Sequence, residues 1–126
     1  MSSQQPKPPV FAGARVEKPW GHELIWARTD RYVGKILHIK AGHALSLQYH
    51  RVKDETVCLF SGTLKFVIGE GPEQDERILG PGESIHVTPG MRHRMVAVTD
   101  CDVLEASTPE LDDVVRLDDR YGRSGT

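Results

Sequence analysis

The chain has no long apolar run and few cysteines. No stretch approaches the ~20 consecutive apolar residues of a transmembrane helix, and no apolar signal-peptide core follows Met1. Its two cysteines, Cys58 and Cys101, lie inside apolar segments, which favours buried free thiols in a reducing compartment over a disulfide. We therefore expect a soluble cytoplasmic protein that makes no contact with a membrane.

An excess of positive charge is also missing. The 16 basic and 18 acidic residues give a formal net charge of −2, which provides no basic field for nucleic acid. The length of 126 residues argues for one domain with one modest core. Residues 1–13 are polar and rich in proline, so we expect a disordered tail there and a single folded domain over residues 14–126.

Helical periodicity over ten or more residues is a third absence. Short apolar runs are instead separated by Gly, Pro and Asp at intervals of roughly ten residues, a pattern typical of all-β proteins. Ser61-Gly62 predicts a hairpin turn, and Pro81-Gly82 and Pro89-Gly90 predict further turns. Many antiparallel strands without a helix predict a sandwich or jelly-roll barrel. The expected strands are residues 23–28, 33–40, 45–50, 56–60, 63–68, 76–79, 84–88, 93–98, 102–107 and 114–117.

Four polar side chains have the spacing of a metal site. Gln48 and His50 are two residues apart and share one face of a strand. Glu55 begins the next apolar run, and His93 comes from a distant segment. Scattered polar residues on a sheet surface are the competing interpretation, but four donors at this spacing argue against it. This mixed N/O set suits Zn²⁺ first, with Mn²⁺, Fe²⁺, Co²⁺ or Ni²⁺ as alternatives.

The same residues carry a family resemblance. Residues 42–62 resemble the first cupin motif, G-x5-H-x-H-x4-E-x6-G, with Gln48 where the first His usually stands. Residues 82–93 resemble the second motif, although Ala97 replaces its final Asn. The resemblance implies a double-stranded β-helix, the jelly-roll cupin barrel. It also carries the usual four-ligand site over to Gln48, His50, Glu55 and His93.

Further segments are similar to phosphomannose isomerases, including the cupin domains fused to mannose-1-phosphate guanylyltransferases. These segments are Leu-Ser-Leu-Gln-Tyr-His at residues 45–50, Lys-Pro-Trp-Gly at 18–21, and DDVVRLDDRYGR at 112–123. The His-rich run of the fused domains is absent from residues 50–55, and the segment at 108–111 is shortened. The resemblance implies metal-dependent aldose–ketose isomerisation of a sugar phosphate, with mannose 6-phosphate and fructose 6-phosphate as the type case.

This reaction needs a base, and two lysines are candidates. Lys53 lies two residues before Glu55, an offset at which both isomerase families carry a basic residue. Its pKa would have to fall to serve as a base, and a solvated turn lysine is the competing interpretation. Lys35 shares an apolar strand face with Leu37, and snorkelling at the barrel rim is its alternative role.

Two arginines are the candidates for binding the phosphate group. Arg116 and Arg123 lie in the closing segment that matches the isomerase family, and a guanidinium can bind phosphate through two hydrogen bonds. Surface ion pairs with neighbouring aspartates are the competing interpretation.

Two other functional classes stay open. One is a non-catalytic sugar- or nucleotide-sugar-binding module, and the other is another metal-dependent cupin enzyme, such as an epimerase, lyase or oxygenase. We also expect a homodimer that pairs through sheet edges, because an unpaired edge promotes aggregation.

Overall fold

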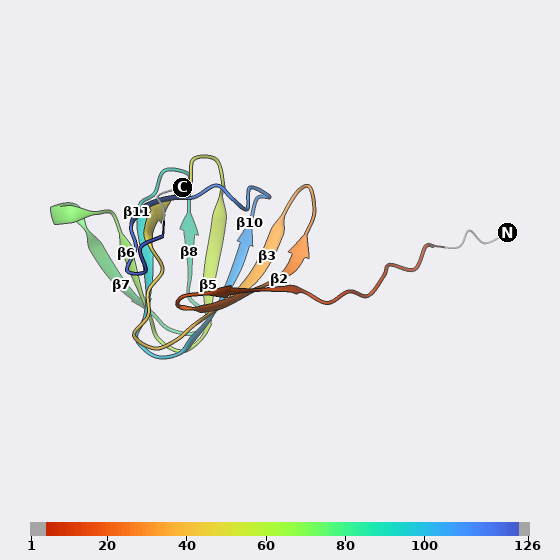
Figure 1. The fold of residues 1–126 in the computed structure, drawn as a ribbon, viewed down its shortest axis with the longest axis horizontal. Helices are drawn as coiled ribbons and strands as arrows, with labels where there is room; N and C mark the ends of the chain where they lie inside the picture. Colours follow the sequence, from red (N-terminus) through yellow and green to blue (C-terminus); the bar gives the residue numbers. More distant parts are fainter. Residues whose placement is uncertain (1–4, 124–126) are drawn as a thin grey trace.

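The computed structural model describes residues 5–123, which form two antiparallel sheets that face each other (Figure 1). In Figure 1 the sheets converge at the bottom of the view and separate towards the top. This all-β arrangement confirms the predicted jelly-roll.

The first sheet has the order β1(Ala14–Lys18), β2(Gly21–Arg28), β3(Val33–Ile39), β10(Cys101–Ser107), β5(Glu55–Ser61), β8(Ser84–Val87). The second has the order β11(Val115–Asp118), β4(Leu47–Tyr49), β9(His93–Ala97), β6(Leu64–Ile68), β7(Asp75–Leu79), and the 3-10 turn η1(Gly71–Glu73) precedes β7.

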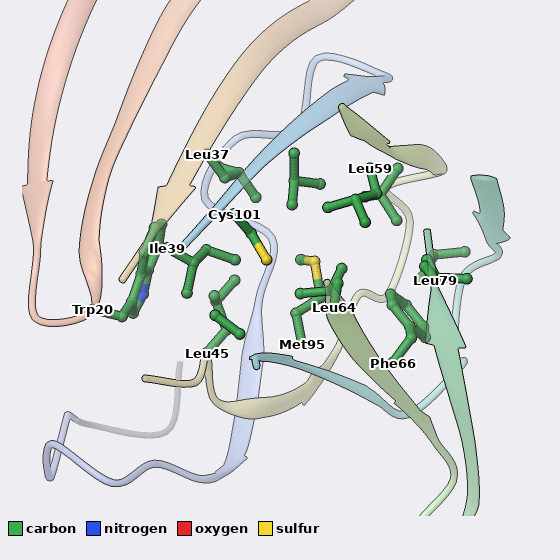
Figure 2. Packing of buried hydrophobic residues seen from close by; sticks show 14 residues of the cluster. Trp20, Leu37, Ile39, Leu45, Leu59, Leu64, Phe66, Leu79, Met95 and Cys101 are labelled. Carbon is green, nitrogen blue, oxygen red and sulfur yellow. The ribbon is translucent and has the colours of Figure 1, made fainter. Parts of the chain in front are cut away.

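Alternation along the strands builds the core between the sheets. Residues 55, 57 and 59 of β5 and residues 101, 103, 105 and 107 of β10 are buried, while their neighbours face outwards. Figure 2 shows apolar side chains from both sheets meeting in this space, among them Leu37 and Leu59 from one sheet and Phe66 and Met95 from the other. Cys101 is buried within this cluster and Cys58 lies outside it, and both thiols are free.

The predicted hairpin at Ser61-Gly62 is wrong. Strand β5 belongs to the six-stranded sheet and β6 to the five-stranded sheet, so the turn is a corner between sheets. Gly62 has a φ of +97°, and a Cβ at this position would collide with the carbonyl oxygen of Asp100. Glycine is therefore required for the close approach of two chain segments.

Two further details differ from the sequence-based expectation. Strand β1 was not predicted, because its exposed residues alternate too weakly to mark an edge strand. Strand β4 is limited to Leu47–Tyr49, so Leu45, Ser46 and His50 lie outside the ladder. Residues 5–13 are nearly all exposed and precede β1, while the disorder predicted for residues 1–13 stays a prediction. Between residues 5 and 123, no helix is long and apolar enough to cross a bilayer.

Candidate metal centre

Three buried side chains from separate segments converge at the site. His50 follows β4, Glu55 begins β5 and His93 begins β9. His50 Nε2 lies 3.1 Å from Glu55 Oε1, and His93 Nε2 lies 3.5 Å from the same oxygen. One potential ligand atom from each residue lies within 4.8 Å of the others, and all three residues are at most 3% exposed. The predicted convergence of these three residues is therefore present in the structure.

Backbone carbonyls orient both imidazole rings. His50 Nδ1 lies 2.6 Å from the carbonyl oxygen of Asp113, and His93 Nδ1 lies 2.8 Å from that of Met91. A ring that donates from Nδ1 can present an Nε2 lone pair, which is the tautomer that a metal-binding histidine uses. His93 Nε2 is buried without a hydrogen-bond partner. An orphaned nitrogen that points at a carboxylate is the arrangement that a bound cation would satisfy, so the residues fit a metal ion.

Glu55 is held as an anion. Burial alone would raise the pKa of Glu55, but the hydrogen bond with His50, the nearby imidazole of His93 and the charge of Lys53 outweigh it and lower the pKa. A permanently ionised carboxylate beside two imidazoles suits a divalent cation.

Gln48 lies beside these residues. It is the Cα partner of His93 in the β4–β9 pairing, so the two side chains project from the same face as close neighbours. Its Oε1 accepts a 2.6 Å hydrogen bond from the buried hydroxyl of Ser46, which leaves a second lone pair on that oxygen. Its role as the fourth ligand stays a prediction.

The site opens into a cavity of about 540 Å³. Core residues Trp20, Leu37, Leu45 and Met95 form an apolar part of its wall. All predicted site residues except His93 line the cavity, namely Lys35, Gln48, His50, Lys53, Glu55, Arg116 and Arg123. Residues predicted from five separate segments of the chain therefore share one space.

Lys53 is a buried cation rather than a solvated turn lysine. It is 4% exposed, and its Nζ lies 3.0 Å from Glu55 Oε2 and 3.1 Å from Glu105 Oε2. Burial lowers the pKa of Lys53, but the charges of Glu105 and Glu55 outweigh it and raise the pKa overall. This direction is opposite to the one that a general base requires, so Lys53 keeps its proton in the metal-free site.

Two buried carboxylates of the cavity were missed by the sequence analysis. Glu105 is 6% exposed and pairs with Lys35 across the β10–β3 register. Burial and the charge of Glu55 raise the pKa of Glu105, against the opposing charges of Lys53 and Lys35. Glu23 is 8% exposed, and both of its carboxylate oxygens lie 3.4 Å from Lys35 Nζ. An acidic residue at an inward position of a strand was the available signal for both.

Lys35 occupies the inward position that the strand alternation predicted. It is 7% exposed and satisfied by Glu23, so it does not extend into solvent at the barrel rim. Together, Glu23, Lys35, Glu105 and Lys53 place charges of alternating sign along the cavity wall. Such a wall offers both donors and acceptors to a ligand that carries many hydroxyl groups.

The two arginines differ in their surroundings. Arg123 forms two side-chain hydrogen bonds with Asp119, at 2.9 and 3.0 Å, as the competing interpretation expected. Arg116 forms no ion pair within residues 5–123, and its buried Nε has no hydrogen-bond partner. Burial and the charge of Arg123 lower the pKa of Arg116. The unpaired guanidinium of Arg116 is therefore the better anion receptor.

Comparison with known proteins shows the family of the chain. The cupin domain family matches residues 35–106. The chain belongs to the cupin family. It is 35% identical over 113 residues to the mannose-1-phosphate guanylyltransferase of Escherichia coli (strain K12), a match that covers 86% of this chain and 23% of that protein. This chain thus spans about a quarter of that relative's length, and it is homologous to the relative's C-terminal cupin domain.

Solved structures agree on the fold of this cupin. KdgF from Halomonas sp. has a TM-score of 0.67 and 20% identity, with 79% of this chain and 90% of that chain covered. Oxalate decarboxylase from Bacillus subtilis, a protein with Mn(II) centres, has a TM-score of 0.69 and 14% identity, with 85% of this chain and 32% of that chain covered. At these identities the likeness shows the cupin barrel alone.

Proposed function

We propose that this cupin catalyses metal-dependent aldose–ketose isomerisation of a sugar phosphate, with mannose 6-phosphate and fructose 6-phosphate as the reference pair. The observation that carries the proposal is the shared cavity, where the His50, Glu55 and His93 cluster adjoins a buried lysine and two buried carboxylates. The guanylyltransferase relative acts on a mannose phosphate by its name, which supports a phosphorylated mannose as the substrate class.

The proposed metal site consists of His50, Glu55 and His93, with Gln48 as the fourth ligand. A divalent cation held there, with Zn²⁺ as the first candidate, would polarise the sugar's carbonyl and stabilise the negative charge that develops on its oxygen. The ligands alone do not select among Zn²⁺, Mn²⁺, Fe²⁺, Co²⁺ and Ni²⁺.

Isomerisation moves one proton from C2 to C1 and another from O2 to O1. Lys53, as an ammonium, can donate a proton to the carbonyl oxygen and recover one from the neighbouring hydroxyl. The carbon-bound proton needs an acceptor on the same wall. Glu105, which accepts a 3.1 Å hydrogen bond from Lys53, is the candidate for that acceptor. Lys35, ion-paired with Glu23, would instead donate hydrogen bonds to the sugar's hydroxyl groups.

The phosphate would bind at the arginines of the same cavity. Arg116 has an unpaired guanidinium, and Arg123 lies close enough for its charge to lower the pKa of Arg116. A phosphate dianion between them would relieve this repulsion and accept hydrogen bonds from both.

Deuterium uptake tests the proposal. NMR in D₂O with added Zn²⁺ or Mn²⁺ should show metal-dependent exchange at C2 of mannose 6-phosphate. Glu55→Ala and Lys53→Ala should abolish it, whereas Lys65→Ala, at a half-exposed lysine paired with Glu76 on the second sheet, should retain it. Absence of exchange with a panel of hexose and pentose phosphates would refute the isomerase assignment.

The second candidate is a non-catalytic module that binds a sugar phosphate or nucleotide sugar. The name of the guanylyltransferase relative favours it, because that activity makes a guanosine-diphosphate sugar. Calorimetry with such a sugar separates the two candidates. Binding that persists in Glu55→Ala, together with no proton exchange in the unmodified protein, would favour the binding module.

A further inference from the structure

The loop at residues 50–54 connects β4 to β5 and carries a large part of the proposed metal site. His50 is its first residue, Lys53 lies within it, and Glu55 follows it as the first residue of β5. None of residues 50–54 belongs to either sheet. Contacts from another part of the chain must therefore fix this loop if His50 is to keep one position.

A single carboxylate accepts hydrogen bonds from three successive N–H groups of this loop. Asp113 Oδ1 lies 3.0 Å from the amide nitrogen of Arg51, and Asp113 Oδ2 lies 2.7 and 2.8 Å from those of Val52 and Lys53. Successive backbone N–H groups form a concave site for an anion. Here the anion is an aspartate 60 to 62 residues further along the chain.

The main chain of the same aspartate contacts the metal site. His50 donates a 2.6 Å hydrogen bond from Nδ1 to the carbonyl oxygen of Asp113. On the other side of the ring, His50 Nε2 lies 3.1 Å from Glu55 Oε1. Asp113 thus holds the loop backbone through its carboxylate and the imidazole ring through its carbonyl oxygen.

Contacts on both sides of Asp113 align the same two segments. Thr108 Oγ1 accepts a 2.9 Å hydrogen bond from the amide nitrogen of Asp54, and the amide nitrogen of Thr108 donates to the carbonyl oxygen of Asp54 at 3.0 Å. At the other end, Arg116 of β11 is the Cα partner of Gln48 on β4. Residues 48–54 and 108–116 therefore run antiparallel, and Asp113 lies between these two contacts.

We propose that Asp113 is a positioning residue for the metal ligand His50. Its carboxylate holds residues 108–116 against the loop, and its carbonyl oxygen then orients the ring. Loss of the outer hydrogen-bond partner of a metal-binding histidine typically lowers the affinity for the metal ~10–100-fold. This role rests on the metal site of the proposed function. It does not depend on isomerase activity, because a cupin that only binds sugars would hold its metal with the same residues.

Calorimetric titration of Zn²⁺ into the unmodified chain and two variants tests the proposal. Asp113→Ala removes all three acceptors from the loop, so the affinity for Zn²⁺ should fall by at least about tenfold. Asparagine keeps one oxygen with two lone pairs, which can still accept from Val52 and Lys53. Asp113→Asn should therefore retain part of the affinity, and it keeps the test valid if Asp113→Ala fails to fold.

Two comparisons separate positioning from a general loss of stability. If Asp113 acts through His50, Asp113→Ala should weaken Zn²⁺ binding much less in a His50→Ala protein than in the unmodified chain. Asp100→Ala is the matched control, because Asp100 Oδ1 also accepts a backbone N–H, that of Ala41 at 2.8 Å. Asp100 precedes β10, whereas Glu55 pairs with Ser107 at the opposite end of that strand. This control should keep the Zn²⁺ affinity of the unmodified chain.

NMR of the metal-free, ¹⁵N-labelled protein supplies a readout that needs no metal. The Nδ1 proton of His50 should be protected from exchange with water in the unmodified chain, and its signal should be lost in Asp113→Ala. Full Zn²⁺ affinity in Asp113→Ala, or equal losses in Asp113→Ala and Asp100→Ala, would overturn the proposal. An unmodified chain that binds no Zn²⁺ would overturn both this role and the metal site. Absence of proton exchange at C2 of the sugar would refute the isomerase assignment alone.

Discussion

Replacement of Lys53 by methionine would test the buried charge cluster most directly. Methionine keeps most of the side-chain volume and removes the ammonium that lies 3.0 Å from Glu55 and 3.1 Å from Glu105. The three side chains are between 2% and 6% exposed, so water cannot replace the lost cation. Removal of one partner from a buried ion pair costs about 3–5 kcal/mol, because an uncompensated charge stays behind.

Protonation of Glu105 limits this loss. Its pKa is already raised, and it rises further when Lys53 is removed. A carboxyl whose pKa is higher in the folded state favours folding below its unfolded pKa, and that contribution disappears as the pH rises through the folded pKa. The loss of stability in Lys53→Met should therefore be largest above neutral pH and should shrink as the pH falls towards 5.

Urea denaturation of the metal-free protein measures this effect. We expect Lys53→Met to lose about 3 kcal/mol at neutral pH, or roughly 10 °C in the melting temperature. Lys65→Met is the control, because the half-exposed Lys65–Glu76 pair at 3.7 Å should contribute less than about 1 kcal/mol. The double variant Lys53→Met/Glu105→Gln should recover part of the loss. A Lys53→Met protein within about 0.5 kcal/mol of the unmodified chain would refute the description of a charge cluster that depends on this ammonium.

Three other outcomes follow from the geometry. His93→Ala should weaken Zn²⁺ binding, measured by calorimetry, by more than the ~10–100-fold that loss of a ligand's hydrogen-bond partner typically causes. An unchanged affinity would show that His93 is not a metal ligand. Asp119→Asn should destabilise the protein above pH 4, because Arg123 lowers the pKa of Asp119 to about 2. The difference in unfolding free energy between the two proteins should disappear as the pH falls through that value. A difference that stays constant in acid titrations would contradict this ion pair. Gly62→Ala should lower stability by more than about 2 kcal/mol, whereas Gly42→Ala, at a φ of +80° with nothing within 4 Å of its Cβ, should lose only about 1 kcal/mol. Equal losses for the two glycine variants in thermal unfolding would refute the predicted collision with the Asp100 carbonyl.

The all-β fold and the convergence of His50, Glu55 and His93 could be predicted from the sequence. Alternation along a strand assigns each side chain to one face of the sheet, and it depends only on the residues of that strand. It also placed Lys35 on the inward face, where the structure shows it. The placement of β5 and β6 in different sheets could not be predicted in this way, since a tight turn looks alike at a hairpin and at a corner between sheets.

For strand residues such as Lys35, Glu55 and His93, the sequence by itself determined which side chains face inwards, because period-two alternation depends only on neighbouring residues. Tertiary structure decided which of them touch. Lys53 and Glu105 are 52 residues apart and meet because β5 and β10 lie side by side in one sheet. That contact raises the pKa of Lys53, where burial alone would have lowered it. The charge state of the cavity therefore depends on distances between strands, which no local pattern encodes.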